Sequence, residues 1–481
     1  MKKRVDPKVL FAVWELEPFL KVGGLGVVAR SLPRALKSRG VDIRLVLPQY
    51  KAFKYHHQRK RKLGELRVKW GEESLTVTVS MITFLNAEIP VYLLGNKKYF
   101  DKPIPGTFAV FAGAVAELLT SPILGEWHPT IVHCNDNHCG LIPLLIKERG
   151  IPVKTLLTIH CVTHQRRSPV EYAEKLGIAK EKLSLMRWEA PARQLNFLLE
   201  GIKHADWVNT VSPTYLKEIQ TEEYGVGLDD VIRKERKKIS AILNGIDYDL
   251  RNPETNPDLA ARYTADPKLS ATAIDLTEPI GAKRANKALL QRRFGLPVKS
   301  EVTVIGFVGR LDARQKGIDV LNLMLWREKF EQCQFVIMGH GEEEWEERFR
   351  NLATFLPETV AVTTEYDDAL ASIIYAGSDF ILIPSHFEPC CLIQMNAMRY
   401  GAIPIARATG GLNDTIANGR NGLLYLAPTA RALYQAIQQA LALKKRSTHQ
   451  YQKMITAAME TDFSWSKSAK QYKALYKKLL A

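Results

Sequence analysis

Short apolar runs alternate with amphipathic segments along most of the chain, and many of these runs end in a polar or glycine-rich loop. The runs of the first half predict strands at 9–13, 42–47, 131–134, 155–159 and 207–211, with a helix at 27–38. Those of the second half predict strands at 302–308, 335–338, 380–383 and 403–406, with helices at 283–294 and 392–401. Apolar strands that alternate with helices are typical of a parallel, doubly wound α/β sheet, whose ligands bind at the carboxyl ends of the strands.

The stretch 384–411 contains a loop that carries Glu388 and leads into a helix start near Leu392. A helix N-terminus presents exposed N–H groups and the positive end of the helix dipole, so this loop suits an anion. Glu388 would repel a phosphate, and its carboxylate is better suited to accept hydrogen bonds from the hydroxyls of a neighbouring ribose. The stretch therefore predicts a nucleotide pocket. The alternative is a buried βα unit in which Glu388 only caps the helix.

A second glycine-rich loop, ELEPFLKVGGLG, follows the first predicted strand. Gly23 and Gly24 permit close approach of the backbone, and Lys21 can supply a point charge to a phosphate. The loop matches neither the GxGxxG nor the GxxxxGK[ST] pattern. A lone glycine-rich loop is weak evidence for a second anion site, because most such loops merely turn the chain.

Three more candidate side chains stand at the ends of predicted strands. Arg310 and Lys316 follow strand 302–308 in the segment GRLDARQKG, and two cations there could neutralise a leaving diphosphate without a metal ion. The alternative for each is a solvated surface residue. His160 ends strand 155–159 and is expected at the ligand edge of the sheet, although a hydrogen-bonded structural histidine is equally compatible with this position.

The cluster HCNDNHC contains four potential zinc ligands, namely His133, Cys134, His138 and Cys139. Residues 133 and 134 would lie on opposite faces of a strand, and the paired ligand spacing of most zinc sites is missing. A metal centre is therefore disfavoured.

A length of 481 residues predicts two domains, and 46% hydrophobic with 25% charged residues is typical of a globular protein. The segment AILNGID indicates a strand that leaves the first sheet, and the Pro- and Asp-rich stretch 253–279 resembles a domain junction. Charges interrupt the N-terminal apolar stretch and the run near 108–116, so neither a membrane span nor an export signal is expected, and the protein is predicted to be cytoplasmic. Six cysteines without CxxC spacing indicate reduced thiols.

The net charge of +16 arises from 67 basic and 51 acidic residues, with basic clusters at 59–62 and 233–238. We find no nucleic-acid recognition motif, and aromatic residues do not interleave with the clusters. The charge therefore favours a solvated basic face around an anionic substrate over a nucleic-acid partner.

Many ordered motifs of the chain resemble those of bacterial and plant glycogen/starch synthases, which are retaining glycosyltransferases. The resemblance covers nearly the whole chain and is carried by KVGGLG, HCNDNHCGLIP, TIH, TVSPTYLKEIQTEEYGVGL, ILNGID, NKALLQ, GRLDARQKG, FEPC, QMNAMRYGAIPIARATGGLNDTI and FSWSKSAKQY. It implies the GT-B fold, in which two Rossmann-like domains face each other across a deep cleft. The expected domains are 1–243, completed by a C-terminal helix within 460–481, and 244–459.

By this resemblance, the reaction transfers glucose from ADP-glucose to the non-reducing end of an α-1,4-glucan, without a cofactor or metal and without a membrane partner. The diphosphate would be held by Arg310, Lys316 and Lys21 with Gly23 and Gly24. Glu388 and the amides of Cys390, Cys391 and Leu392 would bind donor hydroxyls. His160 and Asn244 would lie beside the transferred glucose, and domain closure would exclude water.

Four positions depart from the family pattern at the expected donor site. Val27 replaces an aspartate, Cys161 an asparagine, Cys391 a glycine, and Ile393 a threonine. The tyrosine expected shortly after TIH is also absent, and His164 stands in its place. Each lost hydrogen bond would cost about 1–3 kcal/mol. The resemblance thus favours an active glucan synthase, with two alternatives: an impaired paralogue that binds glucan or a synthase partner, and a related enzyme that uses another nucleotide sugar.

Overall fold

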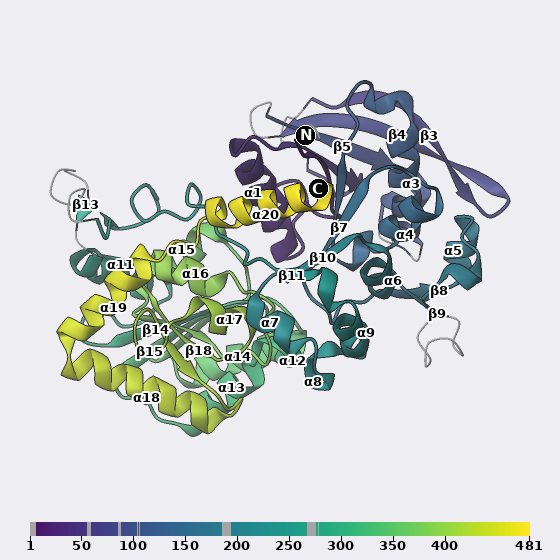
Figure 1. The fold of residues 1–481 in the computed structure, drawn as a ribbon. Helices are drawn as coiled ribbons and strands as arrows, with labels where there is room; N and C mark the ends of the chain where they lie inside the picture. Colours follow the sequence, from purple (N-terminus) through teal and green to yellow (C-terminus); the bar gives the residue numbers. More distant parts are fainter. Residues whose placement is uncertain are drawn as a thin grey trace. The chain divides into compact units, whose positions relative to one another are not determined.

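The computed structural model describes residues 6–54, 59–84, 88–102, 104, 106–184, 194–266, 276–277 and 279–481. Contacts divide the chain into two compact units, one of residues 1–244 with 465–481 and one of residues 245–464. Each unit is built around its own sheet, which is mostly parallel in the first unit and parallel throughout in the second, as Figure 1 shows.

The sheet of the first unit has the strand order β11-β10-β7-β6-β1-β2-β5-β4-β3. Neighbouring strands are parallel from β11 to β5, and β4 and β3 extend the sheet in antiparallel pairing. Its strands are β1 (Lys8–Ala12), β2 (Asp42–Pro48), β3 (Arg61–Trp70), β4 (Glu73–Phe84), β5 (Ile89–Gly95), β6 (Ile131–Asn135), β7 (Lys154–Ile159), β10 (Trp207–Thr210) and β11 (Ile239–Ala241). A separate short hairpin pairs β8 (Arg167–Pro169) with β9 (Gln194–Asn196).

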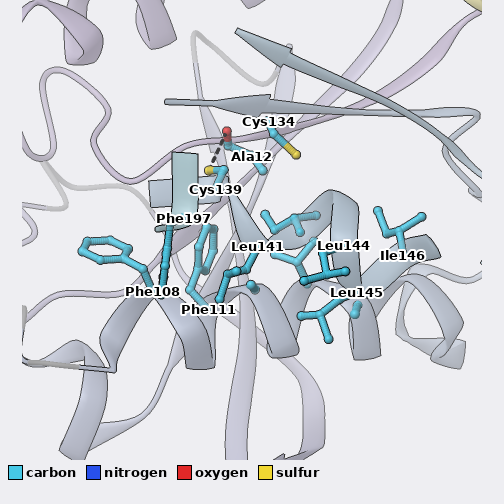
Figure 2. Close-up of a cluster of buried hydrophobic side chains, with 14 of the residues drawn as sticks. Ala12, Phe108, Phe111, Cys134, Cys139, Leu141, Leu144, Leu145, Ile146 and Phe197 are labelled. Atoms are coloured by element: carbon cyan, nitrogen blue, oxygen red, sulfur yellow. Dashed lines mark hydrogen bonds between the residues drawn. The ribbon is translucent and has the colours of Figure 1, made fainter. Parts of the chain in front are cut away.

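The helices of this unit cover both faces of the sheet. They are α1 (Gly24–Ser38), α2 (Lys97–Phe100), α3 (Thr107–Thr120), α4 (Leu141–Glu148), α5 (Glu171–Lys175), α6 (Phe197–His204), α7 (Pro213–Glu218), α8 (Glu222–Gly225), α9 (Asp229–Lys234) and α20 (Trp465–Leu480). Figure 2 shows apolar side chains of α3, α4 and α6, including Phe111, Leu141 and Phe197, packed in the core beneath the sheet.

The C-terminal helix α20 packs against α1 and completes the first unit. Its two fully buried tyrosines are anchored by polar partners: the Tyr476 hydroxyl bonds His133 Nδ1 at 2.8 Å, and Asn209 Nδ2 donates to Tyr472 Oη at 3.0 Å. Helix α20, whose Tyr472 lies 263 positions after Asn209, therefore becomes part of this core through both apolar packing and hydrogen bonds.

The second unit is a doubly wound domain with the strand order β16-β15-β14-β17-β18-β19, parallel throughout. These strands are β14 (Thr303–Val308), β15 (Cys333–Met338), β16 (Val360–Thr363), β17 (Phe380–Ile383), β18 (Ile403–Arg407) and β19 (Leu423–Tyr425). β12 (Arg262–Tyr263) and β13 (Leu276–Thr277) form a separate parallel pair. The helices are α11 (Pro279–Arg293), α12 (Ala313–Lys316), α13 (Ile318–Arg327), α14 (Glu343–Phe355), α15 (Asp368–Gly377), α16 (Ile393–Arg399), α17 (Gly410–Thr415), α18 (Ala430–Arg446) and α19 (Thr448–Glu460).

The structure confirms the predicted α/β class, and the nine strands predicted from the apolar runs are present within about two residues of their expected bounds. The strand expected in AILNGID is wrong in its bounds, because β11 already ends at Ala241 and residues 242–247 contain only an isolated bridge at Ile246. The antiparallel pair β3 and β4 was not predicted. Buried Leu66, Val68 and Trp70 alternate with exposed residues in β3, so a period of two would have indicated this strand. Of the proposed junction 253–279, residues 267–275 and 278 lie outside the described residues, and the described part belongs to the second unit. Among the helices that the structure describes, none has both the length and the apolar character needed to cross a bilayer.

Candidate active site

The second unit brings two predicted loops together at the point where its strand order reverses. β14 pairs with both β15 and β17, so the loops after β14 and β17 leave adjacent strand ends. Gly317 has φ +64°, and a Cβ at this position would lie 2.0 Å from the carbonyl oxygen of Pro384. The amide of His386 donates to the carbonyl of Gln315 at 2.8 Å. Only glycine allows this close approach, which brings Lys316 beside the loop of Glu388.

A buried ion pair joins these two loops. Lys316 Nζ lies 2.5 Å from Glu388 Oε1, and the side chains are only 14% and 3% exposed. Ser385 Oγ donates to the same carboxylate oxygen at 2.9 Å. Burial disfavours the charged ammonium, but the attraction of Glu388 outweighs it and raises the pKa of Lys316 above its ordinary value. Lys316 therefore stays charged at neutral pH. Glu388 is bound by Lys316 and Ser385, which differs from the alternative in which it serves to cap the helix.

The main chain just before Glu388 is held by a buried guanidinium and a histidine. Arg407 Nε donates to the Ser385 carbonyl at 2.8 Å, and Arg407 Nη2 donates to the His386 carbonyl. His386 Nε2 lies 3.0 Å from Asp319 Oδ1 at the start of α13. These contacts join the loop to β18 and α13, so Glu388 is presented by a backbone that is fixed from two sides.

The loop segment of Cys390, Cys391 and Leu392 leads directly into α16, with Leu392 as its N-cap residue. Gln394 Nε2 donates to the carbonyls of Cys390 and Cys391, each at 3.1 Å. The amide of Gly411 donates to the carbonyl of Glu388, and a Cβ at Gly411 would lie 2.2 Å from the Cys390 oxygen. The predicted loop and helix start are therefore present and closely supported.

Cys391 has φ +60°, a conformation that costs a non-glycine residue about 1–2 kcal/mol. The backbone N–H groups of Ile393 and Gln394 bond to its sulfur and favour the thiolate, but burial has the larger effect and raises the pKa of the thiol to about 12. The thiol therefore stays protonated and occupies the helix N-terminus that sequence analysis expected to bind a donor.

Arg310, the other predicted cation of this unit, is placed differently from Lys316. Its side chain is 55% exposed, and Nη2 bonds Gln315 Oε1 at 2.7 Å with Asp312 Oδ2 at 3.7 Å. This guanidinium lies at the mouth of the loop pair and not inside it. Ile393, one of the four departures, packs against the apolar core of this unit.

In the first unit, the glycine-rich loop after β1 surrounds a carboxylate that sequence analysis did not single out. Glu15 is buried, and its Oε2 accepts from the amides of Val22 at 2.6 Å and Gly23 at 2.9 Å. Burial raises the pKa of Glu15 while these bonds lower it, and burial has the larger effect. Gly24 and Lys21 are exposed, and Lys21 Nζ forms an ion pair with Glu17 at 2.9 Å. The Gly23 amide thus already has an internal carboxylate as its partner.

His160 lies at the carboxyl end of β7, as predicted, with its Nε2 3.1 Å from Asn135 Oδ1. The amide nitrogen of Asn135 donates to the carbonyls of Ala12 and His133, so its Oδ1 must be the acceptor. His160 therefore carries its proton on Nε2 and leaves Nδ1 as an acceptor. Burial lowers the pKa of His160 to about 3, so the ring is neutral at physiological pH.

Three buried polar atoms at the same edge of the sheet have no hydrogen-bond partner within the described residues: Tyr50 Oη, Asp136 Oδ1 and His138 Nδ1. Asp136 also has φ +61°, which is unusual for a residue that is not glycine. Burial raises its pKa to about 7, opposed by N–H bonds from Asn137, Cys161 and His160. A buried polar atom without a partner is rare and indicates a place where a ligand or water binds. Asp136 could have been found from the sequence, because it follows β6 directly in the segment NDN.

Three of the four potential zinc ligands, which the sequence disfavoured as a metal centre, make other contacts. Both ring nitrogens of His133 are engaged, by Tyr476 and by Thr158 at 2.8 Å each. The Cys139 thiol donates to the Ala12 carbonyl at 3.3 Å, a contact drawn in Figure 2, and His138 stacks on Trp14. Within the part of the chain that the structure describes, no group of three or more suitable side chains could hold a metal ion.

The other predicted residues of this unit lie near its boundary or in its core. Asn244 is the last residue of the first segment, and its buried Oδ1 has no partner within the described ranges. Cys161 is buried next to His160 with its sulfur 2.9 Å from Thr163 Oγ1. Val27 is half-buried on α1.

Two family models match the chain: the starch synthase catalytic domain over residues 8–234, and glycosyl transferases group 1 over residues 291–460. Together with two Rossmann-like units whose strand ends carry polar side chains, these matches place the protein among the GT-B glycosyltransferases.

Relatives that match over their full length identify the family within this class of glycosyltransferases. The glycogen synthase 2 of Nitrosococcus oceani is 37% identical and is aligned over 98% of both chains. The glycogen synthase of Thermotoga petrophila is also 37% identical, over 98% of this chain and 99% of its own. The catalytic domain of starch synthase IV from Arabidopsis thaliana, solved with ADP and acarbose, superposes with a TM-score of 0.88 at 29% identity, over 99% of this chain and all of that one. The chain belongs to the glycogen and starch synthase family.

Proposed function

We propose that the protein is a glycogen synthase that transfers glucose from ADP-glucose to the non-reducing end of an α-1,4-glucan with retention of configuration. The observation that carries this proposal is the buried pair of Lys316 and Glu388, held at the strand-order reversal of the second unit. Full-length similarity to glycogen synthases supports this function over a non-catalytic role.

In this proposal the second unit binds the donor. Lys316 and the exposed Arg310 meet the charge of the diphosphate, while Glu388 and the main chain of the following loop bind donor hydroxyls. Lys316 has a raised pKa and keeps its charge in a buried place, so it can stabilise the negative charge that develops on the leaving group. The side chains of Lys316 and Arg310 thereby neutralise negative charge, as a metal ion does in other phosphate chemistry. We propose that no cofactor takes part.

In this proposal the first unit binds the transferred glucose and the glucan acceptor. Neutral His160 offers Nδ1 as an acceptor for a hydroxyl, Asp136 carries an unpartnered carboxylate oxygen, and Asn244 an unpartnered amide oxygen. Lys21 supplies an exposed cation beside the glycine-rich loop. A retaining transfer through an oxocarbenium-like centre needs stabilisation of charge and exclusion of water, and the departing diphosphate can accept the proton of the acceptor hydroxyl.

ADP release from the full chain with ADP-glucose and glycogen tests this function, beside the Glu388→Ala variant. We expect release that depends on glycogen and falls by at least about 100-fold in the variant. No release above the variant, with folding and glycogen binding intact, would contradict the proposal. A panel of other nucleotide-glucose donors would then separate changed donor choice from loss of catalysis. A cytoplasmic location stays a prediction.

A further inference from the structure

Arg166, in the loop after β7, has an unusual backbone conformation and an anchored side chain. Its φ is +51°, which costs a residue with a Cβ about 1–2 kcal/mol. Its guanidinium lies over the ring of Phe108, 4.3 Å from the centroid, and Nε donates to Asn137 Oδ1 at 3.2 Å. The amide of Phe197 donates to its carbonyl at 3.1 Å, which holds the strained backbone in place. Strain of this kind is retained mostly at functional positions.

The guanidinium lies at the loop that carries two of the unpartnered buried atoms described above. Its Nε bonds Asn137, which stands between Asp136 and His138, and Phe108, over which it lies, packs edge-on against the His138 ring at 4.7 Å. The charge of Arg166 lowers the pKa values of Tyr50 and His138, and the charge of Asp136 raises the pKa of Arg166. We call Arg166 together with Tyr50 Oη, Asp136 Oδ1 and His138 Nδ1 the Arg166 cluster. Within the described residues, the terminal nitrogens Nη1 and Nη2 of Arg166 have no protein partner. Arg166 itself is exposed to solvent.

The chemistry of the cluster fits a neutral ligand that carries several hydroxyls. It offers donors from a guanidinium and a phenol and acceptors from a carboxylate and an imidazole, and sugar hydroxyls need both kinds of partner. A phosphate is disfavoured, because the carboxylates of Asp136 and Glu15 interact with each other here and Arg166 is a single cation. The forked N–H groups of a guanidinium can reach two adjacent hydroxyls at once, which an ammonium cannot do.

We propose that Arg166 is an acceptor-binding residue, whose terminal N–H groups bind hydroxyls of the α-glucan beside Tyr50, Asp136 and His138. This inference deepens the proposed function and rests on it. It assigns to the first unit a determinant of glucan affinity that is separate from the donor loop of Glu388.

Isothermal titration of maltoheptaose into the full chain without nucleotide tests the inference. The variant Arg166→Gly removes the side chain and suits the left-handed backbone, so we expect a thermal transition that is unchanged or higher. Glucan binding should nevertheless weaken about tenfold, and Arg166→Lys should recover little of it. Arg167→Ala serves as the matched control, because this exposed neighbour bonds Gln165 and should leave binding unchanged.

Steady-state kinetics provide the second measurement. We expect Arg166→Gly to raise the KM for the glucan about tenfold and to leave the KM for ADP-glucose at saturating glucan unchanged. Equal glucan binding by the parent chain and Arg166→Gly, or a change confined to the ADP-glucose KM, would overturn the inference. A parent chain that binds maltoheptaose through Arg166 but transfers no glucose would contradict only the proposed function. A parent chain without glucan binding would contradict both.

Discussion

The polar groups at the ligand edges of the two sheets are satisfied to different degrees. In the second unit, Glu388 is bound by Lys316 and Ser385, and its loop is held by Arg407 and His386. In the first unit, buried Tyr50, Asp136 and His138 each keep an atom without a partner in the described ranges. The Glu388 carboxylate is thus fixed by the protein, although Gln394 Oε1 nearby has no partner in the described ranges, whereas we propose that a ligand supplies the missing bonds at the edge of the first unit.

This difference predicts which substitutions affect stability as well as activity. A pre-formed network loses its internal bonds when one member is removed, so folding and catalysis should fail together. An exposed or unsatisfied group contributes little to folding, so its removal should affect activity alone or even stabilise the protein.

The largest effect is expected for Lys316→Ala, which leaves Glu388 buried without its cation. We expect a loss of about 3–5 kcal/mol in the free energy of unfolding and at least a 100-fold loss in kcat/KM. Denaturant unfolding and ADP release measure the two effects. If the double variant Lys316→Ala with Glu388→Ala were no more stable than Lys316→Ala, the pair would not be the source of the stability.

Asp136→Asn changes one of the unpartnered groups of the first unit, and its effect on stability should depend on pH. The pKa of Asp136 is raised to about 7, so the folded chain holds a proton that the unfolded chain releases near pH 4, and stability due to this proton is lost as pH rises towards 7. Asparagine keeps the acceptor oxygen without the charge. At pH 8 we expect the variant to be more stable than the parent by about 1–3 kcal/mol, with little difference at pH 4.

The same variant should lower the rate of glucose transfer about 100-fold at pH 8, because it removes a charge beside the sugar. Thermal unfolding at the two pH values, with ADP release at pH 8, tests both statements. A variant that is less stable than the parent at pH 8 would show that Asp136 is a structural carboxylate and no binding group.

Lys21→Ala provides the counterpart of Lys316→Ala in the first unit. Lys21 is exposed on the loop and pairs with Glu17, so its loss should change the free energy of unfolding by less than about 0.5 kcal/mol. If it binds the diphosphate, the KM for ADP-glucose should rise about tenfold. An unchanged KM would remove Lys21 from the donor site and leave the loop as a structural turn around Glu15.

The smallest effect is expected for Cys391→Gly, which tests whether the strained backbone at Cys391 lowers stability and affinity. Glycine relieves the left-handed backbone and frees the amides of Ile393 and Gln394 from the sulfur. We expect a gain of about 1 kcal/mol in the free energy of unfolding and an ADP-glucose KM about threefold lower. Cys391→Ala keeps the Cβ and is the matched control. Equal stability of the two variants would contradict the strain.

Much of this architecture could be predicted from local patterns. Apolar runs bounded by glycine and proline predicted the parallel strands, because buried strands of this kind need a continuous apolar sequence. The positions of Lys316, Glu388 and His160 at strand ends followed from the same alternation. The β3 and β4 pair was missed although its period of two was visible in the sequence.

The α/β class, the order of the elements, the family and the stretches that carry the polar residues could all be inferred from the amino-acid sequence. Which of those residues meet follows from the tertiary structure: Lys316 bonds Glu388 across 72 positions, Glu15 fills the glycine-rich loop, and Arg166 bonds Asn137 and lies over Phe108. Local propensity and periodicity act over a few residues. The strand order, which no local pattern encodes, brings distant loops to one edge and sets their burial and charge.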